Sequence, residues 1–263
     1  MRVHVVSDVH GNDIALAKAG DGADALICLG DLILFLDYDD PEGGIFAELF
    51  GAEASRELIA LRTARRFDDA RVLSRSLWES VPGGRAVALE AAVRGQYARI
   101  FGAMMTTTYL TYGNVDLPHL YPDYLREGLH LLDGEVVEIG GLRFGFVGGG
   151  LQTPMRTPFE ISDDEYAAKV RALGSVDVLC SHIPPDLPDL CYDVVARRME
   201  RGSRVLREVI EETQPRWSLF GHVHHPLASR ARIRRTECLN VGHFRSRGVP
   251  LVLEWDSPSV GAR

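Results

Sequence analysis

The sequence lacks the features of a secreted, membrane-spanning or disulfide-stabilised chain. Its cysteines show no C-x-x-C spacing, which indicates small buried hydrophobic residues in a reducing compartment, not zinc ligands or a disulfide framework. The four cysteines are Cys28, Cys180, Cys191 and Cys238. The most apolar stretch, residues 26–36, contains Asp31, and the residues after Met1 are too soon interrupted for a signal peptide. These absences predict a cytoplasmic protein.

Lysine is scarce, since Lys18 and Lys169 are the only two among 29 Lys and Arg residues. The formal net charge is −8, which argues against nonspecific binding to nucleic acid or an anionic membrane, although it does not exclude a local basic patch that binds phosphate. Hydrophobic residues make up 46% of the chain and charged residues 25%, as in ordinary globular proteins. This composition excludes a disordered or collagen-like chain.

Short β-branched segments alternate with longer helical patterns, which indicates a layered α/β fold. Further strands are expected near the C-terminus, and a hairpin around Gly140-Gly141. In open α/β sheets ligands bind beyond the carboxyl ends of the strands, so the polar clusters after the main strands are expected to converge on one site. The main strands are predicted over 3–7, 25–29, 108–112, 176–181 and 217–220, the hairpin over 136–139 and 142–147, and the later strands over 236–241 and 249–255.

Residues 43–105 interrupt the strand series with helical patterning, broken at 81–84 by Val-Pro-Gly-Gly. We predict that this block is a helical insert, a cap or side wall within a single domain that spans residues 1–263. The segment 257–263 is expected to be a frayed end.

Two pairs of polar residues are spaced two apart in the clusters after the strands. They are Asp8 with His10 and His222 with His224. In an extended strand end, residues i and i+2 point to the same side, so each pair can offer two ligands to one cavity. Carboxylate and imidazole groups suit divalent cations such as Mn, Fe(II) or Zn, and no cysteine lies nearby to form a thiolate site.

Three further residues follow strands in the same way. Asp31 and Asn114 each come directly after a glycine, and His182 ends an apolar strand. One such residue alone is usually structural, but seven in this arrangement predict a shared metal site.

The ordered motifs D-x-H-G-N, G-D, G-N-x-D, a strand-terminal His and G-H-x-H resemble the calcineurin-like metallophosphoesterase superfamily, in particular its small bacterial phosphodiesterase branch. The resemblance runs from Asp8 to His224. It implies an α/β fold, a four-layer α-β-β-α sandwich of two mixed sheets, and a centre of two divalent ions, Mn, Fe or Zn. It also implies a dinuclear metal-dependent phosphohydrolase that cleaves a phosphodiester or small phosphomonoester by metal-activated hydroxide.

The resemblance assigns the seven residues to two metals. The first metal takes Asp8, His10 and His224, the second takes Asn114, His182 and His222, and Asp31 bridges the two. Two cations about 3.5–4 Å apart need a shared anionic ligand to relieve their repulsion, which agrees with a bridging aspartate. Asp31, Asn114 and His222 are the expected catalytic residues.

The third motif departs from part of the family. Many members have a histidine after the asparagine, where it contacts the leaving oxygen and can act as general acid, but this chain has Val115. Phosphoprotein phosphatases show G-N-H-E, from which Gly113-Asn114-Val115-Asp116 differs at two positions. This departure disfavours a protein Ser/Thr phosphatase and favours a small phosphodiesterase.

Five other residues are candidates for substrate contact or for support of the ligands. Asn12 is expected to hydrogen-bond a ligand or its loop, and Asp116 either orients a ligand histidine or is a solvated turn residue. Arg156 is a candidate anion clamp in a flexible loop. His225 and His243 follow the last ligand and a strand end, which makes them candidates for contact with substrate.

Two alternatives stay open. One is a nuclease-like phosphodiesterase, and the other is a metal-binding scaffold without activity, as in relatives that have lost ligands. The expected partner is a small phosphorylated substrate, with no membrane and no particular protein partner indicated. Fold class does not choose the substrate.

Overall fold

The structure is a computed structural model that describes residues 1–154 and 156–256. The chain divides into two compact units, one formed by Met1–Leu32 with Ala103–Arg263 and the other by Ile33–Gly102. The end expected to fray, 257–263, lies outside the described residues.

The first unit contains a five-stranded sheet in the order β15-β1-β2-β3-β4. Its four neighbouring strands β1 to β4 run parallel, and β15 joins β1 antiparallel at one edge. Parallel order brings the carboxyl ends of β1, β2 and β3 to one edge of the sheet. The strands are β1 (Arg2–Val6), β2 (Ala25–Cys28), β3 (Thr108–Leu110), β4 (Leu129–Leu131) and β15 (Leu251–Glu254).

A six-stranded sheet in the order β13-β14-β12-β9-β6-β5 forms the second layer of strands. Its central four strands are parallel, and the edge strands β13 and β5 are antiparallel to their neighbours. The predicted hairpin around Gly140-Gly141 is β5 with β6. The strands are β5 (Glu135–Ile139), β6 (Leu142–Val147), β9 (Val178–Ser181), β12 (Trp217–Phe220), β13 (Arg230–Ile233) and β14 (Thr236–Asn240).

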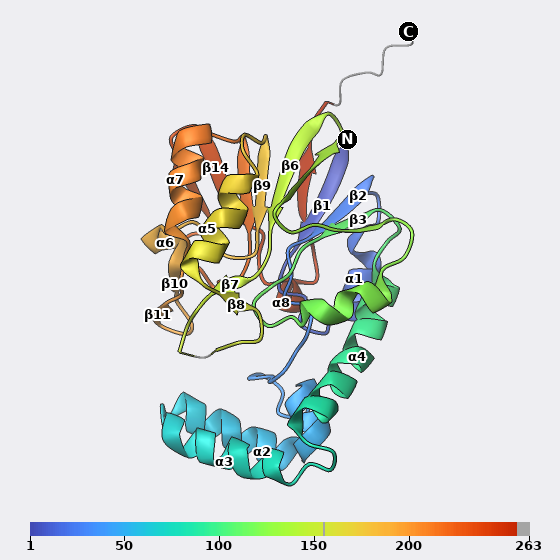
Figure 1. Cartoon of the computed structure of the whole chain (residues 1–263), viewed down its shortest axis with the longest axis vertical. Coiled ribbons are helices and arrows are strands. Elements are labelled where there is room, and N and C mark those ends of the chain that lie inside the picture. The colour runs from blue at the N-terminus through green and yellow to red at the C-terminus, as the bar shows by residue number, and fades with distance from the viewer. Residues whose placement is uncertain (155, 257–263) are drawn as a thin grey trace. The chain divides into compact units, whose positions relative to one another are not determined.

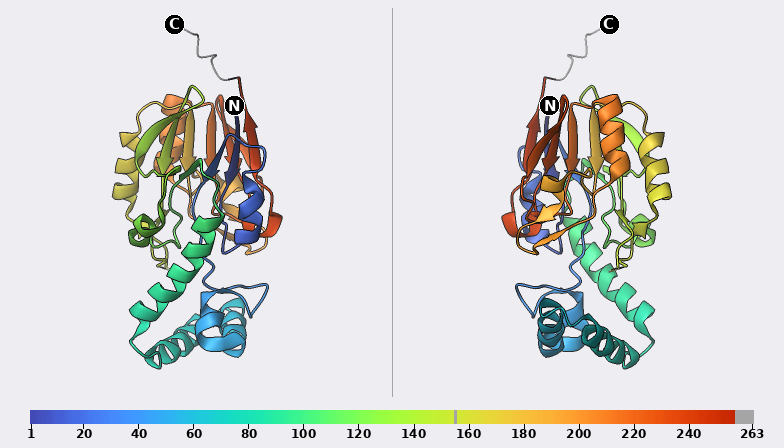
Figure 2. Two further views of the ribbon diagram at one scale, coloured as in Figure 1. Left: turned by 90° about the vertical axis from the view of Figure 1, so that its right-hand side faces the viewer. Right: turned by 90° about the vertical axis from the view of Figure 1, so that its left-hand side faces the viewer.

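The two sheets pack face to face with helices on their outer faces. Alternate residues such as Val3 and Val5 of β1 pack with Phe144 and Phe146 of β6 in the core between the sheets. Helices α5 (Asp163–Ala172) and α7 (Arg204–Thr213) cover the six-stranded sheet, as Figures 1 and 2 show. On the other sheet, His4 points outward and its Nδ1 lies 2.7 Å from the carbonyl oxygen of Ala19, at the end of α1 (Asp13–Ala19). The predicted α-β-β-α sandwich is confirmed.

Short elements connect these layers. They are η1 (Pro118–Tyr124), α6 (Pro188–Cys191), α8 (Phe244–Arg247), and the small paired strands β7 (Gly150–Leu151) with β8 (Glu160–Ile161) and β10 (Tyr192–Asp193) with β11 (Arg198–Met199).

The second unit is helical, as the sequence pattern indicates. It contains α2 (Gly44–Thr63), α3 (Phe67–Glu79) and most of α4 (Arg85–Ala103), and the predicted break at 81–84 separates α3 from α4. Its core packs Phe46 against Leu36, Leu58 and Ala70. The role of this block as a cap or side wall stays a prediction. Among the described residues, no helix has both the length and the apolar character needed to cross a membrane.

Candidate metal centre

The structure brings the predicted ligands together at the carboxyl ends of β1, β2, β3, β9 and β12. Three sets of side chains place one possible ligand atom each within 4.8 Å of the others. Asn114 lies beside the set that contains His182, since its Oδ1 is 3.0 Å from His182 Nε2. The sets are Asp8, His10 and Asp31; Asp31, His182 and His222; and His10, His224 and His243.

Glycines permit the close approach of these loops. A β-carbon at Gly113 would collide with the carboxylate of Asp31, and one at Gly221 would collide with the side chains of Ser7 and Asp8. A larger residue at either position would push the loops apart. The glycines of the G-N and G-H motifs therefore explain how carboxylates and histidines from distant parts of the chain come within contact distance.

Four of the seven predicted ligands have left-handed backbones, with φ of 56° at Asp8, 40° at His10, 55° at Asp31 and 68° at His222. This conformation costs a residue with a β-carbon about 1–2 kcal/mol and is found mostly where the surrounding structure enforces it, often at functional sites. The predicted extended geometry of the D-x-H and H-x-H pairs is therefore wrong. Their side chains meet because tight loops turn them inward.

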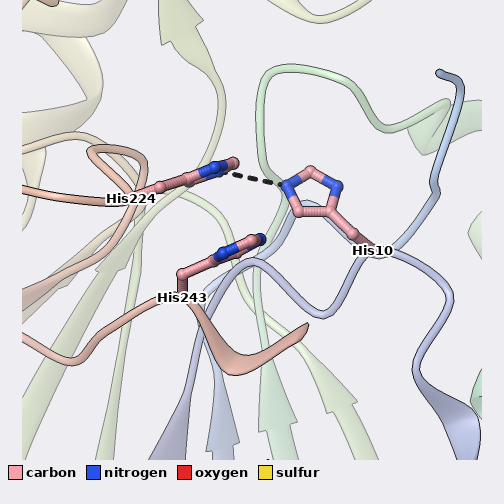
Figure 3. A group of neighbouring side chains, drawn as sticks. All are labelled: His10, His224 and His243. Carbon is pink, nitrogen blue, oxygen red and sulfur yellow. Dashed lines mark hydrogen bonds between the residues drawn. The ribbon is translucent and has the colours of Figure 1, made fainter. Parts of the chain in front are cut away.

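The first group centres on Asp8 and three imidazole rings. Asp8 Oδ2 accepts a hydrogen bond of 2.9 Å from the backbone N–H of His222, whereas Asp8 Oδ1 is buried without a hydrogen-bond partner, 3.4 Å from His224 Nε2. The Nε2 atoms of His10 and His224 are 3.3 Å apart (Figure 3). Carboxylate oxygen and imidazole nitrogen atoms thus face one small volume.

The second group is organised around His182, which is fully buried. Its Nδ1 lies 2.9 Å from the carbonyl oxygen of Leu29, so Nδ1 carries the proton and donates it there. Its Nε2 faces Asn114 Oδ1 and, at 3.4 Å, Asp31 Oδ2. A ring that is held by a carbonyl on one nitrogen and directs the other toward a carboxylate and an amide oxygen is arranged as metal-binding histidines usually are.

Asn114 is oriented by a hydrogen-bond chain that the sequence analysis did not identify. The Asn114 amide donates from Nδ2 to Thr157 Oγ1 at 2.9 Å, and Thr157 Oγ1 donates in turn to Glu160 Oε1 at 2.8 Å. Glu160 also accepts from the backbone N–H groups of Thr153 and Thr157. This chain directs the amide oxygen of Asn114 toward His182.

The Asp31 carboxylate lies between the two groups. Its Oδ2 is 3.9 Å from His10 Nε2 and 3.4 Å from His182 Nε2, and its Oδ1 accepts a 3.0 Å hydrogen bond from the backbone of Val115. The side chain is almost completely buried. Asp31 is thus the carboxylate that faces histidines of both groups.

The charges of the site favour a cation. Burial alone would raise the pKa of both carboxyl groups, but the charge of His224, 3.4 Å from Asp8 Oδ1, holds the pKa of Asp8 well below its usual range, and His182 lowers that of Asp31 to about 2. Burial disfavours a charged His182, yet Asp31 outweighs it and raises the pKa of His182 to about 9. Two ionised, buried carboxylates thus select for positive charge.

Two other histidines are neutral. Burial, together with the charge of His182, lowers the pKa of His222 to about 4, and burial with His224 and His10 lowers that of His243 to about 3. A neutral imidazole has an unshared pair, as a metal ligand requires.

Asp116 supports the site through the backbone. It accepts hydrogen bonds from the N–H groups of Asp31, Leu32 and Gly113, at 2.9, 2.9 and 2.8 Å. The solvated turn residue considered for Asp116 is wrong, because the side chain is completely buried. These three amides belong to the loops after β2 and β3, which carry Asp31 and Asn114. That Asp116 orients a ligand histidine stays a prediction. Burial and the nearby Asp31 charge raise its pKa to about 6.

Asn12 acts on the loop after β1. Its Oδ1 accepts from the backbone N–H of Ala15 and so caps α1, and its Nδ2 donates to the carbonyl oxygen of Arg245 at 2.9 Å. Arg245 Nη1 in turn donates to the carbonyl oxygen of His10 at 2.8 Å. Asn12 therefore ties the loop that holds Asp8 and His10 to the segment after β14.

The candidates for substrate contact lie at two hollows in the surface. His225 and His243 line one of about 320 Å³, beside His224. Arg156 is exposed and lines another of about 650 Å³, together with Thr157 and Glu160. Whether any of these residues contacts substrate stays a prediction.

The cysteines take no part in the centre. All four are buried, as predicted, and burial raises the pKa of Cys28 and of Cys238 to about 12. The donor atoms at the site are therefore oxygen and imidazole nitrogen.

Comparison with known proteins identifies the family. The calcineurin-like phosphoesterase family matches residues 1–226. The chain belongs to this family. The predicted family is confirmed. The uncharacterized protein MJ1162 of Methanocaldococcus jannaschii is 32% identical over 123 residues, 43% of this chain and 53% of that protein. The chain thus spans about half the length of this curated relative.

Solved structures share the fold. The crystal structure of TT1561 from Thermus thermophilus is 14% identical with a TM-score of 0.51, and the match covers 93% of this chain and 90% of that one. Another solved structure matches with a TM-score of 0.56 at 12% identity, over 92% of this chain and 91% of that one. At these identities the likeness shows the fold alone.

Proposed function

We propose that this protein is a dinuclear metal-dependent phosphohydrolase that acts on a phosphodiester or small phosphomonoester in the cytoplasm. The observation that carries the proposal is the place of Asp31, a buried carboxylate 3.9 Å from His10 and 3.4 Å from His182. A carboxylate between two sets of histidines is what a pair of divalent ions requires, because its negative charge offsets their mutual repulsion.

The residues present fit such ions. Asp8 Oδ1 and both ring nitrogens of His243 are buried without hydrogen-bond partners among the described residues. Polar atoms left unpaired inside a protein are costly, so a ligand that satisfies them is favoured. Nitrogen and oxygen donors together suit Mn, Fe(II) or Zn.

In this proposal each residue has a defined task. Asp8, His10 and His224 hold the first ion, Asn114, His182 and His222 hold the second, and Asp31 holds both. When bound, the ion pair supplies an activated water and positive charge for the phosphoryl oxygens. Asp31, Asn114 and His222 act in catalysis by fixing that charge at the phosphoryl group. Asp116 and Asn12 keep the ligand loops in place through their backbone hydrogen bonds.

Hydrolysis of model esters tests the activity. Metal-stripped protein reloaded with Mn is expected to hydrolyse bis(4-nitrophenyl) phosphate, 4-nitrophenyl phosphate or both, with release of nitrophenolate measured by absorbance. Protein that binds the metal but hydrolyses neither ester contradicts the proposal and favours a metal-binding scaffold. Cleavage of single-stranded DNA or RNA in preference to the small esters favours the nuclease-like alternative.

Single alanine variants of four histidines are expected to fall into two classes. His10→Ala and His224→Ala each remove a nitrogen ligand of the first ion, and His182→Ala and His222→Ala each remove one of the second. Both members of a pair should therefore weaken the binding of the same ion by at least tenfold. Elemental analysis after equilibration with limiting Mn and Zn measures this. His119→Ala, which removes an exposed imidazole from η1, is the control. A grouping of His10 with His182 would contradict the assignment of ligands.

Thr157 provides a milder test of the second ion's site. Thr157→Val removes the hydroxyl that accepts from Asn114 and donates to Glu160, so Asn114 can rotate its amide oxygen away from His182. We expect about 10–100-fold weaker binding of the second ion, the usual cost of losing a group that orients a ligand. Thr157→Ser keeps the hydroxyl and should bind the second ion as tightly as the unmodified protein does. Calorimetric titration of each metal-stripped protein with the metal measures these affinities. Equal affinities for the Val variant and the unmodified protein would contradict this role.

A further inference from the structure

His243 lies beside the first group of ligands but outside the seven-residue motif. It follows β14 and directly precedes α8, and the backbone after it is tied to the first ligand loop. The N–H of Phe244 donates to the carbonyl oxygen of Ser7, and that of Arg245 donates to the carbonyl oxygen of Asp8, both at 3.0 Å. These two bonds fix the Cα of His243 next to Asp8, in a position that the sequence spacing alone does not reveal.

The imidazole of His243 faces the histidines of the first group. Its ring lies parallel to that of His224, with centroids 3.9 Å apart and an angle of 5°, and its centroid is 5.6 Å from that of His10. Figure 3 shows the rings of His224 and His243 side by side, both directed toward His10. One ring nitrogen from each of the three histidines lies within 4.8 Å of the others.

Both nitrogens of His243 are buried, and neither has a hydrogen-bond partner among residues 1–154 and 156–256. A neutral imidazole carries one N–H and one unshared pair, and such groups rarely stay unsatisfied inside a protein. One of these nitrogens lies within 4.8 Å of a ring nitrogen of His10 and of one of His224. A cation among the three rings satisfies the unshared pairs together.

We propose that His243 is an additional nitrogen ligand of the metal held by Asp8, His10 and His224. This inference rests on the proposed function. A third imidazole gives this ion three nitrogen donors besides the carboxylates, which shifts its preference toward Fe(II), Co or Zn and away from Mg or Mn.

Two variants separate ligation from stacking. His243→Phe keeps a flat ring on the face of His224 but offers no nitrogen, and His243→Ala removes both ring and nitrogen. The control is His119→Ala, on η1 and exposed. Thermal unfolding of the metal-free proteins checks that the variants fold.

Titration of the metal-stripped proteins with Co(II), followed by calorimetry and by visible absorption, measures the outcome. The unmodified protein and the control should bind two ions. Both His243 variants should bind one ion at least tenfold more weakly, with an altered cobalt spectrum, and keep the ion that His222→Ala loses.

Three results would overturn the inference. Unchanged affinity and spectrum in both His243 variants mean that no nitrogen of His243 binds the ion. A loss in the Ala variant alone means that the ring only packs against His224. If the His243 variants lose the same ion as His222→Ala, His243 binds the second metal and not the first. If instead the unmodified protein binds no cobalt, the proposed function fails together with this inference.

Discussion

Replacing Asp31 with asparagine is expected to lower kcat about a thousandfold, which corresponds to about 4 kcal/mol of transition-state stabilisation. Asn keeps the size of the side chain but removes the charge that lies 3.9 Å from His10 and 3.4 Å from His182. Without it, two dications repel each other across the site, and at least one should be lost. The variant is therefore expected to lose metal and activity together.

Steady-state hydrolysis of an aryl phosphodiester and elemental analysis of the same samples measure the two effects. Asp21→Asn makes the same chemical change on the exposed surface and should leave both unchanged. Retention of two ions and of full activity in Asp31→Asn would refute the dinuclear assignment. Loss of activity with both ions retained would leave Asp31 a catalytic role but not the role of the required bridge.

The fold was largely predictable because its main signals are local. Buried strands such as β2 and β12 are short and largely apolar, and the Val-Pro-Gly-Gly break at 81–84 interrupts the helical pattern where α3 ends. Strand ends were less predictable. The strand expected over 108–112 ends at Leu110, since the chain then turns into the loop that carries Asn114.

The candidate site was predictable only as far as its motifs reach. Spacing indicated which residues gather at the strand ends, but it implied extended pairs where Asp8, His10 and His222 have left-handed backbones. No local pattern marks such a turn at a residue other than glycine, because the contacts that enforce it come from other loops. Thr157 orients Asn114 from 43 residues away, a partnership that sequence spacing does not show.

Asp116 illustrates the same limit. Its position three residues after Gly113 is compatible with a residue in a turn, and its hydrogen bond from the Gly113 N–H at 2.8 Å is local. Its bonds to Asp31 and Leu32 cross from β3 to β2, which are neighbours only in the folded sheet. The function of a side chain that binds two loops follows from topology, and topology requires the structure.

The second large effect concerns the leaving group and Val115. An alkoxide needs a proton as the ester bond breaks, whereas an aryl oxide departs more easily without one, and a positioned general acid contributes about 10²–10⁴-fold. By the resemblance to the family, Val115 stands where many members are expected to have a histidine. Its backbone N–H donates to Asp31 Oδ1 at 3.0 Å, so its side chain starts beside the centre. We therefore expect kcat/KM to fall steeply as the pKa of the leaving group rises.

Val115→His is expected to flatten this dependence by accelerating the poorest leaving groups up to about a hundredfold, the lower end of what a general acid supplies. A series of aryl and alkyl phosphodiesters, measured when the chemical step limits the rate, gives the slope for each protein. Val136→His adds a histidine on the half-exposed edge strand β5 and should leave the slope unchanged.

Two results would count against this expectation, and each points to a different cause. A shallow slope in the unmodified enzyme means that another group already protonates the leaving oxygen. His225 is the first to test, because its side chain is 47% exposed at the hollow beside His224. A steep slope that Val115→His leaves unchanged means that this side chain does not face the leaving oxygen, because the loop after β3 then directs position 115 away from the scissile bond.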